Sequence, residues 1–250
     1  MNAPDEDGEV KTKLGVFSLS ASSPDGTDDR YLAWHHLDHL PQQYEVTGVL
    51  FGQRWVSTPD CRAARVAASD RFDPVNHVVH YLFGEPVAQS VDEFFTLRDH
   101  LIEIGRFPER LPNRLVYGGE PVEVHAAPSA SVTADVLPYR PNRGLHLVIE
   151  RSEPPGDAAR WSPEHVDALL GIDGVAGMWS FAPTTLRPDE FSRSGYCVAA
   201  IYLEEEPTRV AGAVNAVLAD RWSESSLTPA LAAPFEALLP FDYARHARPG

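Results

Sequence analysis

The sequence predicts an α+β protein in which two tandem βαββαβ units pack their antiparallel sheets into one α/β barrel. Two observations lead to this prediction. A histidine-bearing helix precedes a glycine turn in each half, since His39 lies nine positions before Gly48 and His165 lies nine positions before Gly174. The strands and helices predicted around these turns recur in the same order, which indicates an internal duplication.

The first unit follows from alternating and helical hydrophobic patterns separated by turn residues. A strand over 13–20 leads into a helix that begins at 27–29 and ends between 41 and 44. Strands over 49–56 and 76–83, a helix over 89–104 and short strands over 115–117 and 122–125 complete the unit. The segment 60–74 is predicted to be an irregular excursion or a short helix.

The second unit repeats this order. Its strands are predicted over 145–151, 175–181 and 196–203, and its helices over 162–170 and 207–222. Tyr81 aligns with Tyr202 at an offset of 121 positions. The histidine helices align at an offset of 126 positions, so a few residues were gained or lost between the helix and the tyrosine strand. The proline-containing segment 223–250 is predicted to hold little regular structure beyond a last strand near 238–243.

Four regions result from these assignments. They are a disordered tail over 1–12, an N-terminal half over 13–125, a linker rich in proline, alanine and serine over 126–144, and a C-terminal half over 145–250 with an irregular tail. Two helices on one face of each sheet leave the other face bare, and packing the bare faces together would enclose a cavity. We therefore expect two sheets face to face, and not a single sheet that spans both halves.

The amino-acid composition indicates which classes of binding partner the protein can have. The formal net charge of −15 argues against nucleic acid and anionic membranes, because both require clustered lysine and arginine. Cys61 and Cys197 lie far apart without a CxxC pair, so neither a disulfide framework nor a zinc site is indicated. No secretory signal and no apolar run near ~20 residues is evident. The expected protein is cytoplasmic, a monomer or homodimer, and its bias toward arginine and alanine is typical of a GC-rich bacterial genome.

Several catalytic motifs are absent from the sequence. It contains no GxSxG, no phosphate-binding loop, no GxGxxG after a strand and no CxxC. These absences argue against serine hydrolases, nucleotide-dependent enzymes and simple dehydrogenases.

The run 34–41, followed by Gly48, resembles the first helix and turn of dimeric α/β-barrel (ferredoxin-like) proteins, especially the EthD-like group. Members often have an aromatic pair, an acidic residue, His-Leu-Pro and then a Gly-Phe turn. The fold resemblance covers 14–124 and 145–222. The matching residues are Trp34, Asp38, His39, Leu40, Pro41 and Gly48; the departures are His35, His36 and Val49; the second half keeps His165 and Gly174.

The resemblance implies a fold more firmly than a reaction, because the reactions of this family are diverse. They include cofactor-free oxygenation, cyclisation, isomerisation and, in tandem relatives, haem chemistry. We expect an enzyme of secondary metabolism or aromatic catabolism that binds a hydrophobic aromatic or polyketide-like substrate in the barrel cavity without a cofactor. A haem enzyme with His165 or His146 as ligand and a non-catalytic ligand-binding protein are the alternatives.

His39 and His35 lie one helical turn apart and form the predicted acid/base pair. His39 is the expected general base or acid, and its recurrence in the second half and its match to the family motif favour a functional role. No metal is expected, since no third ligand occurs at a familiar spacing. Tyr81 or Arg54 would stabilise developing enolate charge, and Asp38 would orient the His39 ring.

The remaining predicted site residues would bind the ligand. Most histidines lie in the first half, so the principal site is expected there, with the second half supplying apolar walls. If His39 has a pKa near 6 to 7, activity should fall below that range. The predicted ligand-binding residues are Trp34, Trp55, His77, His165, Trp179 and Tyr202.

Overall fold

The structure is a computed structural model that describes residues 10–108, 111–152, 159–191 and 195–243, so residues 1–9 of the predicted tail lie outside the described residues. The described strands are β1 (Leu14–Ala21), β2 (Val49–Val56), β3 (Ala67–Ala68), β4 (Val75–Phe83), β5 (Asn113–Ala126), β6 (Gly144–Arg151), β7 (Val175–Pro183), β8 (Tyr196–Leu203) and β9 (Thr228–Ala237). The helices are α1 (Asp28–Trp34), η1 (His35–His39), α2 (Leu40–Gln43), α3 (Pro59–Ala63), α4 (Val87–Glu103), η2 (Pro128–Ala130), η3 (Leu137–Tyr139), α5 (Pro163–Leu170) and α6 (Pro207–Ser223).

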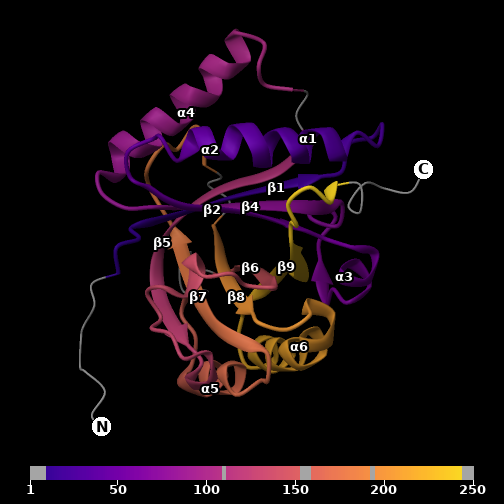
Figure 1. Ribbon diagram of the computed structural model, residues 1–250. Helices are drawn as coiled ribbons and strands as arrows, with labels where there is room; N and C mark the ends of the chain where they lie inside the picture. The colour runs from indigo at the N-terminus through magenta and orange to yellow at the C-terminus, as the bar shows by residue number, and fades with distance from the viewer. Residues whose placement is uncertain (1–9, 109–110, 153–158, 192–194, 244–250) are drawn as a thin grey trace.

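Eight antiparallel strands close into one barrel, with helices packed against its outside at two opposite ends (Figure 1). The strand order is β2-β4-β1-β5 in the first half and β7-β8-β6-β9 in the second. The short β3 pairs with β9 outside this ring. The fold is therefore α+β, with two tandem ferredoxin-like units forming one α/β barrel, and the fold-class prediction is confirmed.

The two halves are joined edge to edge, which corrects the expectation of two separate sheets. β5 is one 14-residue strand instead of two short ones. Its first part pairs with β1 and its second part pairs with β7, so it belongs to both halves. The halves thus meet at two seams, of which β5 forms the first. At the second seam, β9 pairs with β2 where Ala237 lies opposite Trp55. The barrel is one continuous sheet, closed at these two seams.

The whole of β9 lies in the segment after residue 223 that was predicted to be mostly irregular, and the last strand predicted near 238–243 is wrong, because β9 ends at Ala237 and no strand follows it up to residue 243. Pro229 and Pro234 lie in its ladder with β6, where a proline normally weakens a strand because it has no N–H to donate. The other edge of β9 pairs only briefly, with β3 and with β2. Prolines are tolerated on such a sparsely paired edge. The sequence pattern alone does not reveal that this strand has such an edge.

The repeat is visible in the glycine turns. Gly48 and Gly174 have φ values of 83° and 89°, a backbone conformation that favours glycine. Each turn starts a strand whose first residue is Val49 in one half and Val175 in the other. Both halves therefore enter their second barrel strand through the same left-handed turn.

The strand pairing also corrects the predicted alignment of the two tyrosines. Val49 pairs with Phe83 and Val175 pairs with Leu203, so this strand repeats at an offset of 120 positions. A shift of one residue turns a side chain to the opposite face of a sheet. Tyr81 accordingly faces the helices, whereas Tyr202 faces the barrel interior.

Side chains fill the barrel interior, as expected for eight strands. The predicted substrate cavity between the sheets is instead occupied by the hydrophobic core. The largest fully buried side chains of this core are Phe17, Trp55, Phe72, Tyr117, Trp179, Phe181, Tyr202 and Phe235. None of the helices in the described residues has both the length and the hydropathy needed to cross a membrane.

His80 is a polar exception inside the barrel. Its ring stacks on Phe17 with the centroids 4.2 Å apart. Neither ring nitrogen has a hydrogen-bond partner within the described residues. Burial lowers the pKa of His80 to about 3, so the ring is neutral in the folded protein at neutral pH.

Replacing His80 by leucine should flatten the acid dependence of stability. The unfolded chain binds a proton near pH 6.5 and the folded chain only near pH 3, so this contribution to stability is complete above 6.5 and is lost as pH falls toward 3. Removing the His80 ring should reduce the slope of the unfolding free energy against pH by about 1.4 kcal/mol per pH unit between pH 6 and 4. Urea denaturation at several pH values measures this slope. The exposed His100→Gln variant is the control, and a slope unchanged in His80→Leu would contradict the assignment.

Candidate functional site

The outer face of the first half-barrel forms the floor of a pocket. Strand pairing places Arg54 of β2, Val79 of β4 and Ser18 of β1 in one row across the sheet. The neighbouring row contains Tyr81 of β4 and Val16 of β1. These side chains lie on the sheet face that packs against the helices, not on the face that fills the barrel.

Helices cover this floor and leave a pocket of about 300 Å³. This volume lies at the lower end of the range for small-molecule sites. The lining combines aromatic rings with a few polar groups from several elements. The lining residues are Val16, Ser18, Ser20, Tyr31, His35, His39, Gln43, Arg54, Val79, Tyr81, Phe94, Phe95, Arg98, Phe107, Leu111, Asn113, Val116 and Glu190.

His35 and His39 reach the pocket from a π-helical segment. α1, η1 and α2 form one continuous helix, in which the Leu40 N–H donates to the His35 carbonyl group. Pro41 has no N–H to donate to the Leu37 carbonyl group and its ring crowds that group, so the α-helical ladder is interrupted here. The two histidine rings meet edge to face, with their centroids 5.7 Å apart.

Both histidines are held by neighbouring side chains. His35 Nε2 lies 2.9 Å from the Tyr81 hydroxyl oxygen, and His39 Nε2 lies 2.9 Å from Gln43 Nε2. Trp34 stacks on the His39 ring at a centroid distance of 4.8 Å. Nδ1 of each histidine is buried and has no hydrogen-bond partner within the described residues. One nitrogen of each ring therefore makes no hydrogen bond within the described residues.

The surroundings keep both histidines neutral. Burial lowers the pKa of His39 to about 4, and the Arg54 charge acts in the same direction. Burial and Arg54 also lower the pKa of His35 well below its ordinary value. Burial raises the pKa of the Tyr81 phenol, and Arg54 opposes that rise. At neutral pH the pocket therefore holds two neutral imidazoles, a neutral phenol and a guanidinium cation.

Arg54 is a buried cation that has no counter-ion among the described residues. It is 4% exposed, and within the described residues its side chain makes no hydrogen bond or ion pair. It lies over the Tyr31 ring, 5.4 Å from the centroid. Glu190, a carboxylate of the pocket lining, is already bound by Arg98 through two hydrogen bonds of 2.8 and 3.0 Å. An uncompensated buried charge is costly, so the pocket favours a ligand oxygen that carries or develops negative charge.

Three predicted residues lie beside the pocket. Asp38 forms a 2.9 Å ion pair with Arg106 at the surface, so the structure does not place it as the group that orients His39. Trp34 stacks behind that ring instead of lining the pocket. His77 shares the outer face of β4 but lies 2.9 Å from the buried Asp28 carboxylate, which leaves it engaged within the protein.

Four other predicted residues lie elsewhere. Trp55, Trp179 and Tyr202 belong to the barrel core, where each is at most 1% exposed, because side chains occupy the space that was expected to be a cavity. His165 lies on α5 in the second half. What the second half contributes to the pocket is Glu190, from the segment between β7 and β8.

Some residues of the pocket were not predicted. Gln43 follows His39 by four positions on the same helix, a spacing that places two side chains on one face and was a usable signal. Ser18 and Ser20 alternate with apolar residues along β1, which also marks a polar patch on one face. Glu190 carries no local signal, because only the tertiary contact with α4 brings it to the pocket.

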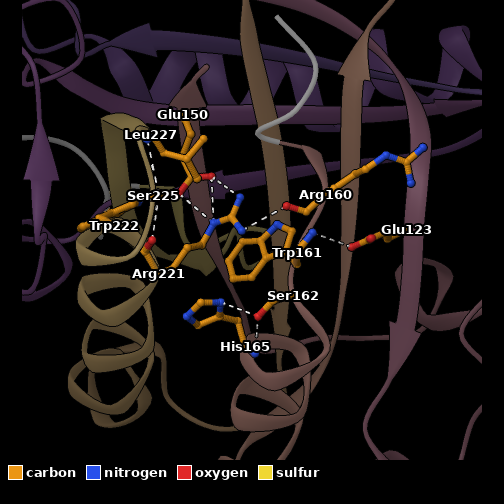
Figure 2. A network of polar contacts seen from close by, with 10 residues as sticks. All are labelled: Glu123, Glu150, Arg160, Trp161, Ser162, His165, Arg221, Trp222, Ser225 and Leu227. Atoms are coloured by element: carbon orange, nitrogen blue, oxygen red, sulfur yellow. Dashed lines mark hydrogen bonds and ion pairs between the residues drawn. The ribbon is translucent and has the colours of Figure 1, made fainter. Parts of the chain in front are cut away.

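The described residues include one group of three potential metal ligands, and it lies outside the pocket. His165 Nε2 is 3.6 Å from Asp220 Oδ2 and 3.7 Å from Glu224 Oε2. Figure 2 shows His165 next to Ser162, below the buried ion pair of Arg221 and Glu150. His35 and His39 have no third metal-binding side chain beside them in the described part of the chain.

The residues predicted as haem ligands do not fit that group. His146 is completely buried on the outer face of β6, and burial lowers its pKa to about 3. A packed apolar cluster that includes Trp161, Leu169 and Leu218 fills the space between this part of the sheet and the helices α5 and α6. A planar macrocycle beside His146 or His165 would have to displace these side chains.

Comparison with known proteins extends the description of the fold. No family model and no curated protein sequence matches the chain. Among solved structures, a candidate chlorite dismutase matches with a TM-score of 0.53 and 12% identity, over 93% of this chain and 98% of that one. The chain has the tandem dimeric α/β-barrel fold. The EthD-like group is not among the groups that these comparisons identify.

Two further solved structures are similar. A candidate monooxygenase from Fusobacterium nucleatum subsp. nucleatum has a TM-score of 0.52 and 9% identity, over 92% of this chain and 94% of that one. A variant of the chlorite dismutase from Candidatus Nitrospira defluvii has a TM-score of 0.52 and 10% identity, over 95% of this chain and 94% of that one. At these identities the likeness concerns the fold, and the chemistry depends on the pocket.

Removing the Arg54 charge should raise the pKa of both pocket histidines. Arg54→Met keeps a long side chain but removes the cation that disfavours imidazolium. The pKa of His39 should rise above about 4 and stay below 6.5, because burial is its larger cause. An NMR titration of the histidine rings measures both values. Arg106→Gln is the matched control, since this exposed arginine acts on His39 more weakly and should give a smaller rise. A larger rise in the control would contradict the central role of Arg54.

Proposed function

We propose that the protein is a small-molecule enzyme in which His39 removes a proton from a carbon next to a substrate carbonyl group. One observation carries the proposal: His39, His35, Tyr81 and Arg54 converge on one pocket of about 300 Å³. A base, a phenol and a fixed cation are the groups that such a proton removal requires. The chain itself supplies all three, so the reaction proposed here uses no organic cofactor.

His39 accepts the proton at Nδ1, the buried ring nitrogen without a partner. This tautomer carries its hydrogen on Nε2, which donates to the Gln43 side-chain oxygen once the amide is turned to present Oε1. Gln43 Oε1 has no partner within the described residues, and the rotation gives it the His39 hydrogen to accept. Gln43 thereby positions the ring and stabilises the imidazolium that forms.

Arg54 stabilises the enolate oxygen that develops as the proton leaves. Its guanidinium is buried in a site with little water, where a fixed charge acts more strongly than in solution. Tyr81, on the next strand, is linked to His35 and can donate its hydroxyl hydrogen to the same oxygen. Arg54 has no ion-pair partner among the residues that the structure describes, and the charged intermediate would supply one.

The pocket walls favour a flat hydrophobic substrate. Tyr31, Phe94, Phe95 and Phe107 surround the polar groups. An aromatic or polyketide-like carbonyl compound fits this lining, which places the enzyme in secondary metabolism or aromatic catabolism. Oxygenation, cyclisation and isomerisation of such compounds all begin with the same proton removal. The likeness to a candidate monooxygenase makes oxygenation the first of these reactions to assay.

The two alternatives make different demands on the pocket. A haem-dependent reaction, as in some tandem α/β barrels, needs an open space beside His146 or His165, and the packing there opposes it. A non-catalytic binding protein would show saturable ligand binding that does not depend on histidine ionisation. Two desolvated histidines next to an arginine that has no counter-ion in the described part of the chain add nothing to simple binding of an apolar ligand, so this arrangement favours catalysis.

Replacing His39 by alanine should lower turnover by about 10²–10⁴, the range expected for loss of a general base. Mass spectrometry of small molecules that co-purify with the protein supplies the assay substrate. His36→Ala is the matched control, because His36 lies on the same helix and its ring faces Tyr243 outside the pocket. Melting temperatures confirm that both variants fold. Unchanged turnover in His39→Ala would remove this residue from the mechanism.

The pH profile should have its acid limb near pH 4. A general base works in its neutral form, so activity is retained above the pKa of His39 and falls as pH decreases through about 4. This corrects the expectation of a limb near 6 to 7, which ignored burial. Because acid also destabilises the fold, rates are measured after brief exposure and compared with the melting temperature at each pH. A limb near 6.5 would indicate that a solvated group is the base.

A further inference from the structure

Three potential metal ligands meet where the end of α6 passes the start of α5. Asp220 and Glu224 are four positions apart at the C-terminal end of α6, and His165 lies in the first turn of α5. One ligand atom from each residue lies within 4.8 Å of the others. This cluster is in the second half-barrel, so it is independent of the pocket and of the function proposed for it.

His165 is held in one orientation. It is 7% exposed, and Ser162 Oγ lies 2.8 Å from its Nδ1. The same oxygen accepts the backbone N–H of His165 at 3.2 Å as the helix cap. Figure 2 shows this contact and shows the other ring nitrogen directed away from Ser162. Metal-bound histidines are commonly oriented in this way by a partner at the second nitrogen.

The nitrogen directed away from Ser162 has no hydrogen bond within the described residues. The nearest carboxylate oxygens, on Asp220 and Glu224, lie at 3.6 and 3.7 Å, which is too far for a hydrogen bond. When Nδ1–H donates to Ser162, Nε2 presents a lone pair to two negative carboxylates. Bonds of about 2.0–2.2 Å to zinc place neighbouring ligand atoms roughly 3–3.6 Å apart, close to the two distances from His165 Nε2 to the carboxylates.

We propose that His165, Asp220 and Glu224 bind a divalent transition-metal ion such as zinc. One imidazole nitrogen and two carboxylate oxygens are suitable ligands, and the exposed carboxylates leave room for water to complete the coordination. Arg221, which lies between them in sequence, turns inward to Glu150 at 3.0 Å. The ion would connect α5 to the end of α6 and stabilise the second half-barrel.

Zinc chloride added to the untagged, metal-free protein tests the proposal. Zinc at about 100 times its Kd should raise the melting temperature by roughly 5–10 °C. Calorimetric titration should give one site per chain. Asp220→Asn and Glu224→Gln should each weaken zinc binding at least about 10-fold, and Ser162→Ala should weaken it by about 10-fold. Asp167→Asn, which removes an exposed carboxylate from α5 outside the cluster, is the control and should bind zinc like the unaltered protein.

Three results would overturn the proposal. They are no zinc binding by calorimetry, no change in melting temperature, and equal affinity in Asp220→Asn, Glu224→Gln and the Asp167→Asn control. Any of these would mean that His165 and the two carboxylates form only a surface ion-pair cluster. Both carboxylates are more than 60% exposed, so their amide variants should fold normally. This test does not measure turnover of the pocket substrate. A failure of the zinc proposal can therefore be distinguished from a failure of the proposed enzyme mechanism.

Discussion

The filled barrel interior is the constraint on which the rest of the structure depends. Eight strands enclose a space that is filled by aromatic and aliphatic side chains, and these side chains form the main core. A ligand must therefore bind outside the barrel, between the sheet and its covering helices. The first half provides such a pocket where a π-helical turn and Gln43 bring His35 and His39 over the strands. The matching space in the second half is closed by packing around Trp161.

Electrostatics then give the pocket its chemical character. Burial and the Arg54 charge act together to keep His35 and His39 neutral, and the same charge is unpaired in the described structure. A cationic ligand would be repelled by Arg54 and an anionic oxygen would be attracted. One buried arginine thus influences both the ionisation of the proposed base and the sign of charge that the site accepts.

The fold was predictable because its signals are local and repeated. Hydrophobic periodicity and the paired turns at Gly48 and Gly174 placed most elements within two residues of their observed ends. The seams were not predictable, because β5 and β9 join partners that lie far apart in sequence. His35, His39, Tyr81 and Arg54 do meet in one pocket. Trp55, Trp179 and Tyr202 were misplaced, since alternation along a strand does not reveal which face is the barrel interior.

The seam between β2 and β9 joins strands from opposite ends of the chain, so it can form only after the last strand has been synthesised. β2 is an edge strand of the first half until Ala237 of β9 reaches Trp55, 182 positions later in the chain. While the protein is being made, the nascent first half exposes this edge to other chains near the ribosome. Leu50, which remains 38% exposed on β2 after closure, adds an apolar side chain to that edge. Early chain release would leave Trp55 and Val56 without their β9 partners, so this end of the β2 edge is completed only when the last strand has been made.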